Sequence, residues 1–514
     1  MKTQTIQYKI NIIKESPKFL LLLSFIEMWE RFSYYGMRAL LVIFMTSVFG
    51  FSDPKAYAIY SVYAALSYAG PVLGGILADR LMGFQKMIVL GALVNSFGHL
   101  AMVFSGISQT MFYIGLGFVA FGSGMFKGNI SNLLGSCYND NDPKRDSGFT
   151  VFYVAVNLGG FLASVLCGYV AYAYGWHYGF GLAGIGMLLG VITLIRFRAI
   201  LNGKGMPPKP DALKRSLSIK TTASSIKILN PFLRKLSNES LVWIGSGITS
   251  LICALILYYS ENMMLFFTII GIATMAYVSY EFTKQSSKDK RNMFILGLLT
   301  IFFVCFFALE MQIGSLIALF TERNVETAVF GITIPSTVSQ SMNPLSIILF
   351  GSLANRLWLK IGYKHNLTRF GGGLAMMVIS FLALYIGCLT ANSGGLVNYS
   401  YLIISAFAMG IGELCIAPLM LSLCSLLAPQ RLKGFFMGVL MLSMAFANMA
   451  GMLIGKFMSV PQLSPGLINP LVSLNIYQEG FFKIMVFNIA LCIVFIGIIP
   501  LINKITNAIN YKYQ

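Results

Sequence analysis

Charged residues are scarce in this sequence. Asp, Glu, Lys and Arg together make up 11% of the 514 residues, whereas a soluble domain averages about 25%. A chain with so little charge cannot cover a large water-facing surface, which excludes an ordinary soluble protein. The sequence is instead 57% hydrophobic, in recurring apolar runs of about 20 residues, the length that crosses a bilayer as a helix.

The residues of common enzyme sites are scarce as well. The three His lie in separate regions, and neither HExxH nor GxSxG occurs, which excludes the usual zinc and serine hydrolase sites of a membrane enzyme. The eight Cys include no CxxC pair, so we expect small buried hydrophobic residues and not disulfides or metal ligands. We therefore expect no enzyme activity, no cofactor and no metal.

The alternation and turn spacing of a β-barrel are also missing. Runs such as 90–104 and 486–501 are continuously apolar, so the sequence predicts an all-α membrane protein. We expect fourteen spans, at 20–49, 57–78, 87–105, 108–136, 148–170, 178–195, 240–260, 262–280, 293–319, 336–355, 370–391, 399–427, 434–455 and 484–503.

The net charge of +19 is explained by where the basic residues lie. With the N-terminus in the cytoplasm, most of the 37 Lys and Arg fall in cytoplasmic segments, and Lys55, Arg323, Lys456 and Lys483 fall outside. The positive-inside rule predicts this asymmetry and places both termini in the cytoplasm. A nucleic-acid partner is therefore not needed. The basic stretch 196–235 would attract anionic lipid headgroups.

Two related halves are indicated by an internal repeat. GILADRL at 75–81 recurs as GSLANRL at 351–357, each at the cytoplasmic end of the second span of its half. Two repeated bundles with a site between them is a common transporter plan. Asp79 and Arg80 of the first copy are expected to clamp their loop and could act as a gate. The expected parts are an N-terminal tail at 1–19, a six-helix bundle at 20–198, a basic linker at 199–239, two extra helices with a linker at 240–292, a second six-helix bundle at 293–503 and a tail at 504–514.

Ionisable residues within spans are costly, so each is a candidate for function. The first span carries a polar stripe, because Glu27, Arg31 and Arg38 fall within a narrow arc at about 100° per residue. Glu27 and Arg31 are an i,i+4 pair that can bond directly. The alternative for this stripe is a structural salt bridge to a neighbouring helix. The complete set is Glu27, Glu30, Arg31, Arg38, Lys127, Glu310 and Glu413.

The four acids of this set outnumber its three bases, which leaves one acid for a proton or a substrate cation. All three bases lie in the first half, whereas Glu310 and Glu413 lie in the second. A cavity between the halves would suit a zwitterion such as a short peptide or an amino acid. Guanidinium groups bind a carboxylate at two points. Lys127 lies in GSGMFKGN at 122–129, whose small residues let helices approach closely, and Glu413 lies in GIGELCIAP at 410–418, a helix that Gly and Pro interrupt.

The segment EMWERFSYY at 27–35 resembles the ExxERFxYY signature of the proton-dependent oligopeptide transporters of the major facilitator superfamily. The segments 145–159, 340–345 and 412–418 also resemble stretches of that family. The resemblance implies a major facilitator fold, here with two extra helices between the six-helix bundles. The family's Phe-Lys-Pro-Asn is altered by Gly128, and a common Trp is replaced by Leu440.

The resemblance also implies roles for individual residues. Glu27, Glu30, Arg31, Lys127 and Glu310 would couple proton movement to transport. Arg31, Arg38 and Lys127 would hold a peptide carboxylate, Asn157 and Asn343 the peptide backbone or amino end, and Glu413 the ammonium. Tyr34, Tyr35 and Tyr68 would line the pocket.

These observations predict a proton-coupled symporter that imports di- and tripeptides or peptide-like zwitterions by alternating access. The alternative is a transporter of the same build for nitrate, an amino acid or a peptide-like metabolite, or an exporter. Its partners would be the peptide, protons and the lipid bilayer, and it would function as a monomer. The expected location is the bacterial inner membrane.

Overall fold

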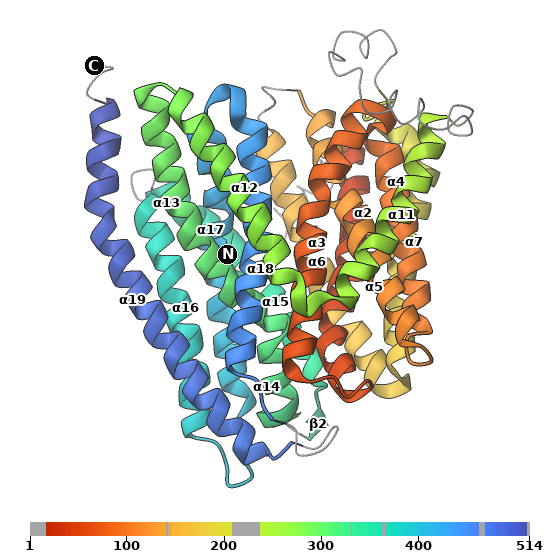
Figure 1. Cartoon of the computed structure of the whole chain (residues 1–514), viewed down its shortest axis with the longest axis vertical. Coiled ribbons are helices and arrows are strands. Elements are labelled where there is room, and N and C mark those ends of the chain that lie inside the picture. The colour runs from red at the N-terminus through yellow and green to blue at the C-terminus, as the bar shows by residue number, and fades with distance from the viewer. Residues whose placement is uncertain are drawn as a thin grey trace, which may run out of the picture. The chain divides into compact units, whose positions relative to one another are not determined.

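The structure is a computed structural model that describes residues 17–139, 142, 144–207, 237–329, 331–361, 366–461 and 468–510. These residues form long α-helices and one two-stranded antiparallel hairpin (Figure 1). The all-α architecture is therefore as predicted. Most of the N-terminal tail, most of the basic stretch 196–235 and the end of the C-terminal tail lie outside the described residues.

The chain forms two compact units. The first comprises Met1–Met37 and Ala69–Tyr258, and the second comprises Arg38–Tyr68 and Tyr259–Gln514. Helices α2 and α3 each contribute residues to both units, because the division falls within them. Each unit is described separately below.

The first unit contains α4, α5, α6, α7 and α11 with parts of α2 and α3. Helix α4 packs against α5 and α7, and α11 packs against α5. The bounds are α2 (Lys18–Ser47), α3 (Asp53–Leu77), a π-helical turn (Ala78–Met82), α4 (Gly83–Val103), α5 (Gln109–Cys137), α6 (Lys144–Tyr174), α7 (Trp176–Phe197), a 3-10 turn (Arg198–Leu201) and α11 (Asn238–Tyr258).

The second unit contains α12 to α19 and the hairpin. Helix α16 lies beside α17 and α19 (Figure 1), and α17 also packs against α15. The bounds are a 3-10 turn (Ser260–Asn262), α12 (Met263–Lys284), α13 (Ser287–Glu310), a 3-10 turn (Met311–Gly314), α14 (Leu316–Asn324), β1 (Ala328–Val329), β2 (Ile332–Thr333), a 3-10 turn (Ser336–Ser341), α15 (Met342–Ile361), α16 (Asn366–Leu389), α17 (Tyr399–Leu427), a 3-10 turn (Gln430–Leu432), α18 (Lys433–Phe457) and α19 (Pro470–Asn510).

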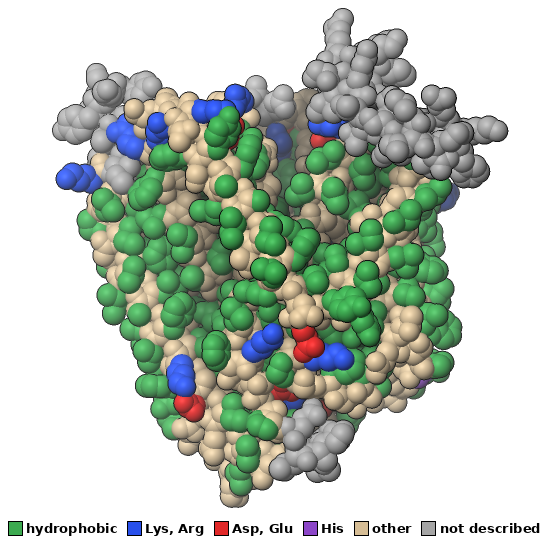
Figure 2. All heavy atoms as spheres, in the orientation of Figure 1, with side chains coloured by type: hydrophobic (Ala, Val, Ile, Leu, Met, Phe, Trp, Pro, Cys, Tyr) green, Lys and Arg blue, Asp and Glu red, His purple; other side chains and the backbone are tan. Residues whose placement is uncertain are grey.

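The helices have the length and composition of membrane spans. Among the described residues, 10 helical stretches are long and apolar enough to cross a membrane. Figure 2 shows hydrophobic side chains over most of the helix surface in view. All eight Cys are free thiols, and five of them are buried. Every predicted span overlaps a helix.

Glycine allows the close helix packing that the segment 122–129 predicted. A Cβ at Gly122 would lie 2.5 Å from the main-chain nitrogen of Asn95 on α4, and a Cβ at Gly124 would lie 2.7 Å from the Cα of Gly70 on α3. Buried side-chain hydrogen bonds join the same helices. Asn95 donates to Ser123 Oγ at 2.7 Å and accepts from Ser33 Oγ at 3.3 Å.

The two helices predicted as additions differ in how they pack. Helix α11 approaches α5 closely, because a Cβ at Gly117 would meet the main chain of Ala254 at 2.5 Å. Helix α12 packs lightly against α18 and is held at one end by an ion pair of 2.9 Å between Glu281 and Arg431. Only 6% of an apolar 18-residue stretch of α12 is buried. Most of the surface of this helix is therefore available to lipid.

The predicted span 293–319 is interrupted in the structure. Helix α13 ends at Glu310, and a 3-10 turn separates it from α14. The Gln312 side chain donates to the Ala308 carbonyl at 2.8 Å, and Ser315 donates to the Gln312 side chain at 3.2 Å. Side chains that bond to nearby backbone compete with regular helix in this way, and apolar composition alone does not reveal the competition.

Candidate functional site

A buried group of charges lies on α2 in the first unit. Arg31 Nε lies 2.9 Å from Glu27 Oε1, which confirms the predicted i,i+4 pair, and Arg31 also forms an ion pair with Glu30. The exposed fractions of the Glu30 and Arg31 side chains are 0% and 4%. One guanidinium therefore neutralises part of the charge of two buried carboxylates.

Lys127 on α5 joins this group through an aromatic ring. Its ammonium lies 4.5 Å from the centre of the Tyr34 ring, and the Arg31 guanidinium lies 5.5 Å from the same ring. Lys127 is also close enough to attract the Glu27 carboxylate. The Tyr34 ring contacts Tyr35 edge to face, with 5.4 Å between the ring centres. Two acids, two bases and two phenols thus meet on α2 and α5. The second base is Lys127 and not Arg38, which the predicted stripe of the first span had included.

The other candidates of the first unit lie on different elements. Asn157 on α6 is buried, and its amide nitrogen donates to the Tyr153 carbonyl one turn earlier at 3.0 Å. Asp79 and Arg80 are exposed within the π-helical turn that follows α3. Gly83 ends that turn with φ of +74°, a conformation that favours glycine.

A second group of charges lies in the second unit. Arg38, at the C-terminal part of α2, donates from Nε to the Tyr60 hydroxyl at 2.7 Å, and its charge attracts the Glu310 carboxylate. A Cβ on Gly314 would lie 2.7 Å from Arg38 Nε. The turn after Glu310 therefore passes close to the Arg38 side chain.

Glu413 belongs to this second group. Arg38 attracts its carboxylate and Glu310 repels it, and Asn343 at the start of α15 lies near it without a hydrogen bond from its amide nitrogen among the described residues. Glu310 is buried and its Oε2 accepts no hydrogen bond from the described residues. Two carboxylates therefore share the attraction of the Arg38 guanidinium. Tyr68 on α3 is half-buried.

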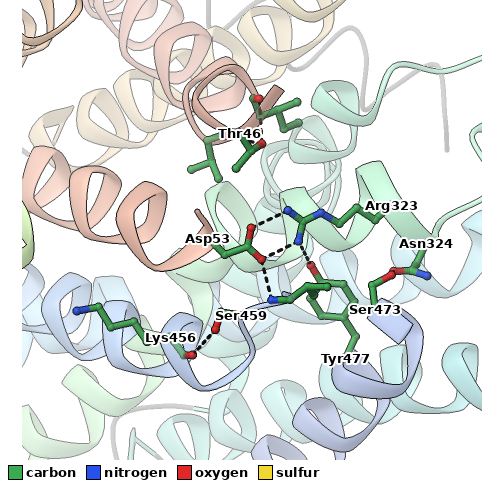
Figure 3. Close-up of polar contacts among 11 residues, drawn as sticks. Thr46, Asp53, Arg323, Asn324, Lys456, Ser459, Ser473 and Tyr477 are labelled. Atoms are coloured by element: carbon green, nitrogen blue, oxygen red, sulfur yellow. Dashed lines mark hydrogen bonds and ion pairs between the residues drawn. The ribbon is translucent and has the colours of Figure 1, made fainter. Parts of the chain in front are cut away.

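A third polar group was not predicted from the sequence. Arg323 on α14 bonds both oxygens of Asp53, the first residue of α3, at 2.7 Å each (Figure 3). The same guanidinium donates to the Tyr477 hydroxyl at 3.0 Å, and the Val460 amide donates to Asp53 Oδ2 at 3.0 Å. The ends of α3, α14 and α19 are therefore joined by a buried ion pair.

The residue after Arg323 continues this junction. The Asn324 amide donates to the carbonyls of Gly395 and Pro470. Its oxygen accepts from Ser473 Oγ at 2.7 Å, and both residues are drawn in Figure 3. A cavity of about 300 Å³ borders Arg323. No sequence signal could have paired Asp53 with Arg323, because each lies at a span end, where a charge is ordinary, and 270 positions separate them.

The arrangement is suited to binding ions. Within the described ranges, no group of three or more His, Cys, Asp or Glu could hold a metal ion. The two groups that contain Glu27 and Glu413 consist of carboxylates, guanidinium groups, an ammonium and phenols on apolar helices. In a membrane protein, such intramembrane charges mark ion and substrate pathways.

Comparison with known proteins assigns the chain to a family. The profile of the POT family matches residues 85–472. The chain belongs to the POT family. It is 31% identical over 500 residues to the dipeptide and tripeptide permease A of Erwinia pyrifoliae, covering 97% of this chain and 96% of that protein. It is 29% identical over 498 residues to the permease of the same name from Escherichia coli, covering 97% and 95%.

The fold agrees with solved structures of this family. A crystal structure of tetrameric PepTSo2 matches with a TM-score of 0.78 and 27% identity, covering 95% of this chain and 98% of that one. Membership of the POT family confirms the predicted family, the major facilitator fold and the class of transporter as opposed to enzyme. It also makes the chain a multi-pass membrane protein related to bacterial permeases.

Proposed function

We propose that this POT family member is a proton-coupled symporter that imports di- and tripeptides or peptide-like zwitterions. The observation that carries the proposal is the pair of acids in the second unit, where Glu310 and Glu413 share the attraction of the Arg38 guanidinium among the described residues. A buried charge without a counter-charge is costly. A proton on one acid, or a substrate ammonium beside it, would remove that cost.

Proton coupling is assigned to the residues that can exchange ion-pair partners. In the first unit these are Glu27, Glu30, Arg31 and Lys127, and in the second unit Glu310. Arg31 already contacts two acids. Protonation of either acid would leave the guanidinium to the other or to a substrate carboxylate. That exchange would couple proton binding to substrate binding.

Substrate binding is assigned by charge. Arg31, Arg38 and Lys127 would bind a peptide carboxylate, since guanidinium and ammonium groups are its usual ligands. Glu413 would bind the ammonium, with Asn343 beside it. Asn157 would contribute a further polar contact. Tyr34, Tyr35 and Tyr68 would line the pocket and contact the peptide side chains.

Alternating access would require contacts between the two sequence halves to break and re-form. Asp53 belongs to the proposed bundle 20–198, and its partner Arg323 belongs to the proposed bundle 293–503. Their ion pair would therefore have to open when α3 separates from α14. Asp79 and Arg80, exposed after α3, would serve as a gate on the cytoplasmic side.

We further propose the inner membrane as the location, with both termini in the cytoplasm. The support is the uneven distribution of Lys and Arg among the connecting segments, which follows the positive-inside rule. A single chain supplies both charged groups, so we propose that the monomer is the functional unit. Vesicles that contain one chain each should still take up peptide. Loss of uptake in such vesicles would contradict the monomer as the functional unit.

A competition assay tests the proposed substrate. Proteoliposomes with the wild-type chain would take up labelled Ala-Ala, and unlabelled di- and tripeptides should compete with it. Free alanine and nitrate should compete poorly at equal concentration. Competition by nitrate or by a free amino acid, with no effect of peptides, would instead support the other solutes that this build of transporter could carry.

A further inference from the structure

Helix α17 contains a carbonyl that its own backbone cannot satisfy. The helix runs from Tyr399 to Leu427 through Pro418. Proline has no N–H, so the carbonyl of the residue four positions earlier, Leu414, loses its helical donor. Arg369 on α16 donates from Nη2 to this carbonyl at 2.8 Å. A side chain from the neighbouring helix thus supplies the hydrogen bond that Pro418 removes.

The guanidinium is held in place by a second helix. It lies 4.8 Å from the ring centre of Trp358 on α15, a favourable arrangement of a cation on an aromatic face. Arg369 Nε is buried without a hydrogen-bond partner among the described residues. An arginine that merely reached for water would not bury this nitrogen, so the geometry favours a specific contact with α17.

Helix α15 also bonds to α17 two turns before Leu414. Ser346 Oγ donates to the Phe407 carbonyl at 3.0 Å. A Cβ on Gly410 would lie 2.8 Å from Ser346 Oγ and 3.0 Å from the Asn343 carbonyl, so glycine is needed for this approach. Contacts with α15 and α16 therefore fix the backbone on both sides of Glu413.

We propose that Arg369 is a positioning residue for Glu413. It holds the turn of α17 before Pro418 through the Leu414 carbonyl, and this sets the position of the adjacent Glu413 carboxylate. The proposal rests on the proposed role of Glu413 as the ammonium ligand. It adds a residue that touches no substrate and acts through the helix backbone.

The arrangement makes a specific prediction about a pair of substitutions. Pro418→Ala restores an N–H that can bond the Leu414 carbonyl, so the helix no longer needs Arg369. Arg369→Met removes the donor but keeps a long apolar side chain. Arg369→Met should therefore cause a large loss of thermal stability and Ala-Ala affinity when residue 418 is proline, and a small loss when it is alanine.

The experiment compares the wild type, both single variants and the double variant in two measurements. The first is the melting temperature of the purified full chain without peptide. The second is the affinity for Ala-Ala and for N-acetyl-Ala-Ala, which lacks the ammonium. Arg369→Met should lower the melting temperature. It should also weaken Ala-Ala binding by about tenfold, which is the effect of losing one hydrogen bond between the substrate ammonium and the displaced Glu413. N-acetyl-Ala-Ala binding should change little.

Two further variants serve as controls. Arg356→Met removes an exposed arginine of α15 and should change neither measurement. Arg369→Lys keeps the charge and one donor and should recover part of the loss, which also keeps the test usable if Arg369→Met folds poorly.

Each other outcome contradicts a stated part of the proposal. Equal losses from Arg369→Met with proline and with alanine at position 418 would show that Arg369 does not replace the missing helical bond. If Arg369→Met lowered the melting temperature only when residue 418 is proline, yet weakened the binding of Ala-Ala and N-acetyl-Ala-Ala equally, the bond would exist but would not position Glu413. If the wild type bound neither peptide, the proposed function would be wrong, and the melting temperatures alone would decide whether the Arg369–Pro418 coupling exists.

Discussion

The ion pair between Asp53 and Arg323 allows a quantitative prediction about stability. The exposed fraction of the Asp53 side chain is 0% and that of Arg323 is 9%. Asp53 receives two guanidinium bonds of 2.7 Å and one amide bond of 3.0 Å from Val460. Among the described residues, Arg323→Met would leave this buried carboxylate with the Val460 amide as its remaining hydrogen-bond donor.

The expected loss follows from removing one partner of a buried pair. Breaking such a pair costs roughly 3–5 kcal/mol, whereas replacing both partners by apolar residues is often neutral. The Asp53→Leu/Arg323→Met variant leaves the Val460 amide and the Tyr477 hydroxyl without these partners, so recovery would be incomplete. We expect it to be more stable than Arg323→Met by about 2 kcal/mol.

The assay is the free energy of unfolding in mixed micelles, measured for the wild type, Asp53→Leu, Arg323→Met and the double variant. Lys483→Met is the matched control, because it breaks a pair of 2.6 Å with Glu479 whose side chains are 71% and 68% exposed. That control should change stability little. If Arg323→Met were as stable as the wild type, or if the double variant were less stable than both single variants, the inferred role of the pair would be refuted.

Three further predictions concern transport. Glu27→Gln and Glu30→Gln should each abolish accumulation driven by a pH gradient but retain counterflow exchange, because the coupling carboxylate is gone; full accumulation by both would contradict this. Arg38→Lys should weaken binding of free-acid peptides roughly tenfold, with less loss for amidated peptides, since lysine lacks the planar fork; equal weakening of both forms would argue against the assignment. Glu413→Gln should cost about 2–5 kcal/mol of affinity for free peptides and little for N-acetylated ones, and equal losses would remove the residue from the ammonium site.

Much of the fold could be predicted from the sequence because apolar length is a direct requirement of the bilayer. The predicted span 399–427 has the same bounds as α17, where the Asn398 side chain caps the first turn and Pro429 follows the end. The last helix was predicted too short, as 484–503 against Pro470–Asn510. Its first turns carry polar residues such as Glu479, so a search for continuous apolar sequence does not include them in the span.

The candidate site was predictable where the signal was local. Glu27 and Arg31 lie one turn apart on one helix, and their ion pair follows from that spacing. Asp53 and Arg323 pair across 270 positions, which no local pattern encodes. The contact of Arg369 with Leu414 is also hidden from local patterns. Pro418 deprives the Leu414 carbonyl of its helical donor on α17, and Arg369, which replaces that donor, lies on α16. Long-range pairs of this kind require the packed helices to be known.

Proton uptake that accompanies peptide uptake tests the central claim most directly. Proteoliposomes would contain a pH-sensitive dye, and Ala-Ala would be added outside with an inward proton gradient. The proposed function predicts internal acidification that begins with Ala-Ala, saturates with its concentration and fails in Glu27→Gln and Glu30→Gln. Ala-Ala accumulation without acidification, or no response to any di- or tripeptide, would contradict proton-coupled peptide import.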